Sequence, residues 1–160
     1  MYNNQLYADV LLNFYYVLMN AYGWWFWLRG DVTRRSQSDQ LSVAWMPQST
    51  WIPLGLIALV SIGAMGWYFD NFTEADLAYP DSFTTVVSFI AMWMSAKKYV
   101  ENWVLWFVVN VVSVGLYGIK AQQDPQLYLY VVLYAVYIWL AVVGWRSWRA
   151  DMPQAKASPA

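Results

Sequence analysis

The sequence predicts an all-α, polytopic helical membrane protein. Of its 160 residues, 60% are hydrophobic and 12% are charged, about half of the roughly 25% charged residues of soluble domains. The chain also holds 12 Trp and 13 Tyr, residue types that concentrate at membrane–water interfaces. Apolar runs close to the roughly 20 residues that a helix needs to cross a bilayer recur along the chain. The lipid bilayer is therefore its expected surrounding.

The composition excludes several functional classes. The chain has no Cys and no His, so a disulfide scaffold, a thiol enzyme, a Ser-His-Asp triad and a zinc site of the usual kind are excluded. With a pI of about 5.1 and a net charge of −1, it lacks the basic face that binds nucleic acid. It also lacks a phosphate-binding loop motif. We expect no enzymatic activity, no metal, no cofactor and no nucleic-acid partner.

Five apolar stretches account for most of the chain, at residues 6–28, 51–69, 83–96, 103–119 and 127–148. The third is short for a crossing helix and could be re-entrant, or could begin slightly earlier with Ser82 as its cap. The predicted organisation is a helix that closes an N-terminal bundle (1–28), a cytoplasmic loop (29–50), a linker helix (51–69), an acidic outer loop (70–82), a C-terminal three-helix bundle (83–148) and a disordered cytoplasmic tail (149–160).

The charges alternate with the predicted crossings. Eight of the nine basic residues fall in segments on one side: Arg29, Arg34, Arg35, Lys97, Lys98, Arg146, Arg149 and Lys156. Lys120 is alone on the other side, which carries Asp70, Glu74, Asp76 and Asp81. The positive-inside rule then places the N-terminus outside and the C-terminus in the cytoplasm. Glu101, close to Lys97 and Lys98, is predicted to join a surface charge cluster of little energetic value.

The first and fifth stretches resemble each other. Residues 5–27 align without gaps to residues 126–148 and share a Gln-Leu-Tyr start and a Gly-Trp-x-x-Trp end. Because both cross in the same direction, the repeat is parallel, as in some transporters with a substrate site between the halves. A complete plan would be parallel three-helix bundles joined by a linker helix (3+1+3). Five of those helices are present here. The glycine pairs Gly63/Gly66 and Gly115/Gly118 predict close helix packing.

Three of the stretches carry polar and aromatic stripes at helical spacing. The members are Trp103, Trp106, Asn110, Ser113 and Tyr117; Asp9, Asn13, Tyr16, Asn20 and Trp27; and Tyr130, Tyr134, Tyr137 and Trp148. Such stripes suit one cavity for a flat, neutral or cationic ring with hydroxyl or amide groups. The alternative is that the asparagines hydrogen-bond between helices. No intramembrane carboxylate pair is present, which disfavours ion coupling.

Several motifs in order resemble the PnuC family of vitamin B3 transporters. They lie at residues 6–13, 22–27, 81–85, 97–106, 110–117 with Lys120, and 144–148, so the resemblance runs from residue 5 to residue 148. The resemblance implies a SWEET-like fold of seven helices, the first two of which this chain lacks. It also implies facilitated diffusion of nicotinamide riboside across the bacterial inner membrane, with alternating access and trapping by cytoplasmic phosphorylation for NAD biosynthesis.

The resemblance also assigns substrate-binding residues. Trp103, Trp106 and Asn110 are carried over as substrate contacts, and the weaker candidates are Tyr117, Asn13, Tyr16, Tyr134 and Tyr137. Two alternatives stay open. The chain could carry another vitamin, such as thiamine or riboflavin. It could also be a truncated, non-transporting membrane fragment, or complete its site by assembling as a homo-oligomer.

Overall fold

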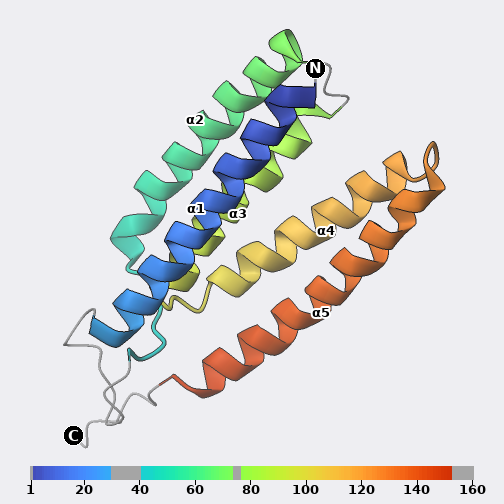
Figure 1. Ribbon diagram of the computed structural model, residues 1–160. Coiled ribbons are helices and arrows are strands. Elements are labelled where there is room, and N and C mark those ends of the chain that lie inside the picture. Colours follow the sequence, from blue (N-terminus) through green and yellow to red (C-terminus); the bar gives the residue numbers. More distant parts are fainter. Residues whose placement is uncertain (1, 30–40, 74–76, 153–160) are drawn as a thin grey trace, which may run out of the picture.

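The computed structural model is helical throughout its main elements. It describes the backbone of residues 2–13 and both backbone and side chains of residues 14–29, 41–73 and 77–152. The elements are α1 (Tyr2–Arg29), α2 (Gln48–Phe72), α3 (Ala78–Ala96), α4 (Asn102–Lys120), a short 3-10 turn η2 (Pro125–Leu127) and α5 (Tyr128–Ala150) (Figure 1). Each of the five predicted stretches forms a helix, so the predicted all-α class is confirmed.

The helices alternate in direction along the chain. In Figure 1, α1, α3 and α5 run one way, while α2 and α4 run back. Helix α3 is central, because it contacts α1, α2 and α4, and α4 pairs in turn with α5. This alternation brings Arg29, Lys97, Lys98, Arg146 and Arg149 to one end of the described bundle, called the basic end below. Asp70, Asp81, Lys120 and Asp124 lie at the opposite end, called the acidic end.

The start of α3 corrects the sequence prediction. The helix begins at Ala78 instead of at residue 83, and no side chain caps it. Ser82 is therefore not a cap: its hydroxyl donates to the carbonyl oxygen of Ala78, one turn earlier, at 2.7 Å. Pro80 is tolerated here because the backbone N–H groups of a first helical turn have no intrahelical acceptor. The full length of 19 residues makes α3 long enough to cross a bilayer.

Other boundaries also shift. Helix α2 extends over residues 48–72 in place of 51–69, so its ends take residues from both predicted loops. The predicted outer loop, 70–82, shrinks accordingly, and Glu74 and Asp76 lie outside the described residues. Most of the predicted tail also lies outside them, while Arg149 belongs to α5.

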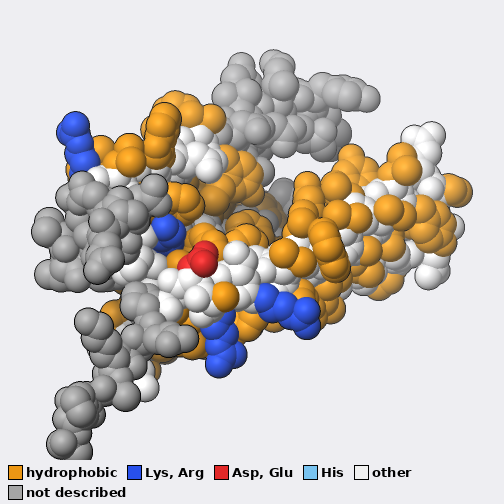
Figure 2. Space-filling model, turned by 90° about the horizontal axis from the view of Figure 1, so that it is seen from below, with side chains coloured by type: hydrophobic (Ala, Val, Ile, Leu, Met, Phe, Trp, Pro, Cys, Tyr) orange, Lys and Arg blue, Asp and Glu red, His pale blue; other side chains and the backbone are white. Residues whose placement is uncertain are grey.

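The surface of the described bundle is that of a membrane protein. Large apolar side chains are exposed along α1, α2 and α5, among them Leu18, Ile52, Leu59, Leu129 and Trp139. Helix α2, helix α4 and the stretch from η2 through α5 are long and apolar enough to span a membrane. Seen from below, the described part of the chain is a largely hydrophobic body with a few Lys and Arg side chains (Figure 2). Helices α1 and α3 contain a larger share of polar residues than α2, α4 and α5 do.

Residues 41–46 dock against the turn between α3 and α4. The amide of Ala44 donates to the Lys98 carbonyl at 3.2 Å, and the Val100 amide donates to the Ala44 carbonyl at 3.0 Å. Lys98 has a positive φ of 57°, a left-handed conformation that costs energy in a residue with a Cβ. The docked segment gives this turn its backbone partners.

Glu101 corrects a second prediction. Its side chain is not part of an exposed cluster, because only 8% of the residue is exposed. Both carboxylate oxygens accept the backbone N–H of Met46, at 2.9 and 3.1 Å. A buried, charge-assisted hydrogen bond of this kind is worth about 1.5–3 kcal/mol. Glu101 therefore anchors the segment before α2 to the start of α4.

The glycine pairs behave differently from prediction. A Cβ at Gly66 would overlap the ring of Tyr79, so Gly66 does allow α2 and α3 to approach closely. A Cβ at Gly63, Gly115 or Gly118 would meet nothing within 4 Å of the described residues. Within this part of the chain, the prediction of close packing thus holds for Gly66 and is wrong for the other three.

Candidate functional site

One cavity lies among four helices. Its volume is about 460 Å³, within the range of about 300–1,000 Å³ that is usual for small-molecule sites. It is lined from α1 by Tyr16; from α3 by Asp81, Thr84, Thr85 and Ser88; from α4 by Trp103, Trp106, Val109, Asn110, Ser113, Leu116 and Tyr117; and from α5 by Tyr134, Tyr137, Leu140 and Ala141. Aromatic, amide and hydroxyl groups therefore face a common space.

The predicted site residues come together in this cavity. Seven of the eight line it: Tyr16, Trp103, Trp106, Asn110, Tyr117, Tyr134 and Tyr137. The eighth, Asn13, lies on α1 where side chains are outside the described residues. The helical periodicity of α4 explains the placement, since positions three, four and seven residues apart share a face.

Two buried polar residues of the cavity lining come from α4. Asn110 and Ser113 are each only 5% exposed, yet both line the cavity. The Trp106 indole N–H lies 3.5 Å from the hydroxyl oxygen of Ser95, which itself donates to the Asn102 side chain at 2.9 Å. Among the described residues, the indole N–H of Trp103 is buried without a hydrogen-bond partner. Because a buried donor without a partner is costly, Trp103 is a candidate donor to a bound molecule.

Tyrosine rings form the wall toward the acidic end. The Tyr117 ring stacks on Tyr134 and on Tyr130, with centroid separations of 5.3 and 5.0 Å. Tyr134 meets Tyr137 edge to face at 6.0 Å. These contacts hold the rings of α4 and α5 in fixed orientations where they line the cavity.

Sequence reasoning missed the contribution of α3. Asp81, Thr84, Thr85 and Ser88 line the cavity, whereas the predicted site residues include none on this helix. Their positions, three, four and seven residues apart, were a usable signal. The hydroxyl of Thr85 donates to the Asp81 carbonyl at 2.8 Å, and that of Thr84 donates to the same carbonyl at 3.0 Å. Because both hydroxyl protons are donated to this carbonyl, the hydroxyl oxygens of Thr84 and Thr85 can act only as acceptors toward a ligand.

An aromatic cluster, made of Trp27, Trp103 and Trp148, lies at the basic end of the cavity. Trp148 meets Trp103 edge to face at 5.4 Å and Trp27 at 6.3 Å. The Trp27 indole donates to the Ala96 carbonyl at 2.9 Å. The cluster therefore joins α1, α3, α4 and α5, and one of its members, Trp103, also lines the cavity.

The aligned helices use equivalent residues in equivalent ways. Tyr16 and Tyr137 occupy the same repeat position and both line the cavity. Gly23 and Gly144 correspond, and a Cβ on either would press on a neighbour, at 3.3 Å from Ala96 and 2.5 Å from Trp103 respectively. Trp27 and Trp148 also correspond, and they touch each other. Equivalent residues meet in this way near a rotation axis, which supports a parallel repeat.

Not every residue of the predicted stripes reaches the cavity. Asn20 donates back to the Tyr16 carbonyl of its own helix at 2.8 Å and is exposed. Tyr130 stands behind Tyr117 and does not line the cavity, and Trp148 closes its end. Asp9 lies where side chains are outside the described residues.

These features define a helical membrane protein with an aromatic and polar cavity between its helices, the arrangement of a carrier for a small solute. Residues 1–150 match the family described as "Nicotinamide mononucleotide transporter". The chain belongs to this family of membrane transporters, which confirms the resemblance read from the sequence.

Named relatives agree with that assignment. The chain is 30% identical over 169 residues to "Nicotinamide riboside transporter PnuC" of Escherichia coli (strain K12), covering 90% of this chain and 67% of the relative. It is 29% identical over 144 residues to "Riboflavin/roseoflavin transporter RibM" of Streptomyces davaonensis, covering 87% of this chain and 65% of that protein. The chain thus spans about two thirds of the length of these relatives.

A solved structure shares the fold. It is titled "Crystal structure of the Vitamin B3 transporter PnuC", and it matches with a TM-score of 0.65 at 22% identity, covering 93% of this chain and 64% of the solved chain. The likeness covers nearly the whole chain, and it shows that the two proteins share a fold.

Proposed function

We propose that this chain carries nicotinamide riboside across the membrane by facilitated diffusion. The observation that supports this most directly is the cavity, in which indole and phenol rings, a carboxamide and hydroxyl groups surround one space. The substrate has matching parts: a flat pyridinium ring, a carboxamide and a ribose. The rings can stack on the pyridinium and attract its positive charge, while Asn110 can pair with the carboxamide.

The absence of a built ion-coupling site supports passive transport. Among the described residues that line the cavity, Asp81 alone is charged. Ion-coupled carriers place several ionisable groups along their pathway. Net uptake would then follow the substrate gradient, and phosphorylation in the cytoplasm would trap the nucleoside and maintain that gradient.

The orientation follows from the charge distribution. The basic end carries Arg29, Lys97, Lys98, Arg146 and Arg149, and the positive-inside rule assigns that end to the cytoplasm. The N-terminus of α1 would then lie outside and the end of α5 inside, in the bacterial inner membrane.

Alternating access requires that one end of the cavity is closed at a time. The aromatic cluster of Trp27, Trp103 and Trp148 lies across the basic end, whereas the lining reaches Asp81 and Tyr117 near the acidic end. This geometry supports a state that is open to the outside. In the state that is open to the cytoplasm, the indole rings of Trp27, Trp103 and Trp148 would move apart.

Thiol labelling tests that orientation and state, because the chain has no Cys of its own. We expect Ser88→Cys, a partly exposed cavity position, to react in intact cells with a membrane-impermeant maleimide and to be protected by nicotinamide riboside. Asp70→Cys and Arg149→Cys, exposed at the acidic and basic ends, calibrate labelling from each side. Labelling of Ser88→Cys only in inside-out vesicles would contradict the assigned state.

Transport itself is tested by uptake of labelled nicotinamide riboside. The chain is expressed in cells that lack their own carrier, and in proteoliposomes without any ion gradient. We expect saturable uptake in both, and in the vesicles equilibration without accumulation. Accumulation that depends on a proton or sodium gradient would refute facilitated diffusion. Absence of uptake would favour a non-transporting fragment or a need for further helices or copies.

Riboflavin is the second candidate, since one relative is named as a riboflavin/roseoflavin transporter. Riboflavin also presents a flat aromatic ring, but its ring system is larger and uncharged. Competition by unlabelled riboflavin, thiamine and nicotinamide riboside in the same uptake assay separates the candidates. We expect only nicotinamide riboside to compete at low concentration. Stronger competition by riboflavin would reassign the substrate.

A further inference from the structure

Asp81 lies where the cavity reaches the acidic end. It belongs to the first turn of α3, and its side chain is 40% exposed while it also lines the cavity. The N-terminal end of a helix favours a negative charge. Asp81 thus places a carboxylate at the edge of the cavity. The other described residues that line the cavity are uncharged.

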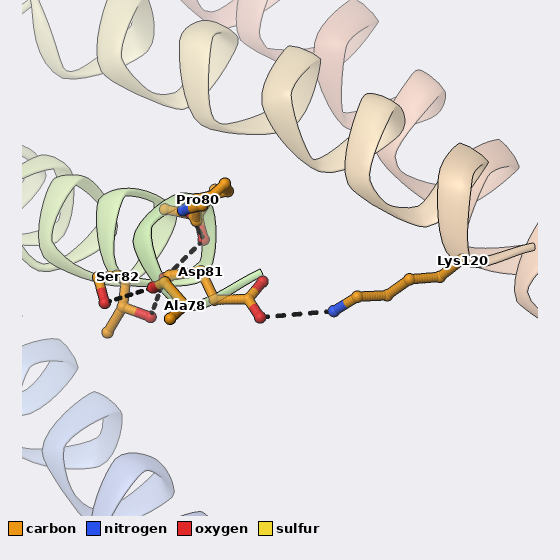
Figure 3. A network of polar contacts seen from close by, with 7 residues as sticks. Ala78, Pro80, Asp81, Ser82 and Lys120 are labelled. Carbon is orange, nitrogen blue, oxygen red and sulfur yellow. Dashed lines mark hydrogen bonds and ion pairs between the residues drawn. The ribbon is translucent and has the colours of Figure 1, made fainter. Parts of the chain in front are cut away.

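The partner of Asp81 is Lys120, at the end of α4. Its ammonium nitrogen lies 3.4 Å from one carboxylate oxygen, Oδ2, and its side chain is 35% exposed (Figure 3). An exposed pair of this kind contributes little to stability, so it is easily broken. Figure 3 shows Lys120 reaching Asp81 across the space between α3 and α4, so the ammonium group stands where a ligand cation could replace it.

We infer that Asp81 is a specificity-determining residue that favours positively charged ring substrates over neutral ones of the same shape. This inference rests on the proposed function and adds a role that aromatic stacking alone does not supply. The carboxylate attracts the cationic ring toward the cavity, and Lys120 competes for the same carboxylate. Removing Lys120 would therefore strengthen binding of a cation, and removing Asp81 would weaken it.

The test compares two ligands of equal shape. Nicotinamide riboside carries the pyridinium charge, and benzamide riboside replaces that ring by a neutral benzene ring with the same carboxamide. Affinities for both are measured by competition in the uptake assay. We expect Asp81→Asn to weaken binding of the cation about tenfold, as expected for one partly screened charge several ångströms away, and to change the neutral affinity less than about twofold.

Two variants complete the design. Lys120→Met should strengthen binding of the cation by a few fold and leave the neutral ligand unchanged. Asp70→Asn is the matched control, because Asp70 is an exposed carboxylate at the same end in the last turn of α2 and does not line the cavity. It should alter neither affinity.

The outcomes separate this inference from the proposed function. If Asp81→Asn weakens both ligands equally, Asp81 acts through structure, and the inference is overturned while the proposed substrate stands. An unchanged preference for the cation in Asp81→Asn would overturn it as well. If the unmodified protein binds neither riboside, the proposed substrate itself fails and the inference fails with it.

Discussion

Trp106→Ala is expected to weaken nicotinamide riboside binding by about 10- to 100-fold. Trp106 lines the cavity from the middle of α4, one turn from Asn110. In the proposed binding mode its indole would stack on the pyridinium ring while Asn110 pairs with the carboxamide. Stacking of a base on an aromatic side chain is worth about 1–3 kcal/mol, which corresponds to the expected loss. Competition in the uptake assay measures it.

Two variants control that experiment. Trp106→Phe keeps an aromatic face and should recover part of the affinity. Trp139→Ala removes an equally large indole that is 63% exposed on α5 and does not line the cavity, so it should leave binding unchanged. An unchanged affinity in Trp106→Ala, in protein that is inserted and folded, would show that the substrate lies elsewhere.

Gly144→Ala is expected to damage both stability and binding. The new Cβ would lie 2.5 Å from the Trp103 ring, so the indole must move out of its packed position between α4 and α5. Overpacking of this kind costs about 1–3 kcal/mol, which lowers the melting temperature by about 3–10 °C in a chain of this size. Because Trp103 also lines the cavity, substrate affinity should fall with it.

Thermal unfolding in detergent, followed by intrinsic Trp fluorescence, measures the first effect, and uptake competition measures the second. Gly118→Ala is the matched control, since a Cβ there meets nothing within 4 Å. Alanine is also the better helix former by about 1 kcal/mol, so the control should melt at the same temperature or slightly higher. Equal melting temperatures for the two variants would contradict the close packing of Gly144 on Trp103.

Much of the site could be predicted from local periodicity. Trp103, Trp106, Asn110 and Tyr117 share one face of a helix wherever that helix packs, and polar groups in a bilayer must face the protein interior. The α3 face was missed although its hydroxyls follow the same spacing. The apolar run begins at Phe83, so hydropathy alone leaves Asp81 in the preceding loop.

The interaction partners of single charged residues could not be predicted from local periodicity. Glu101 is close to two lysines in sequence, which suggests a surface cluster. In the fold its carboxylate accepts the amide of Met46, 55 residues away. Asp81 likewise pairs with Lys120 across 39 residues. Such partners depend on how the helices pack against one another, which the residues next to Glu101 or Asp81 in the sequence do not determine.

The sequence by itself determined that the chain forms apolar helices of alternating direction, with basic residues at one end and aromatic and amide stripes along three of them. These features depend on hydropathy and on the period of the helix, which are local properties. The tertiary structure alone decided that the stripes enclose one cavity, that Trp27 meets its repeat counterpart Trp148, and that Asp81 lines the cavity and pairs with Lys120. Those relations arise from packing between distant segments, where shape and close approach select the neighbours.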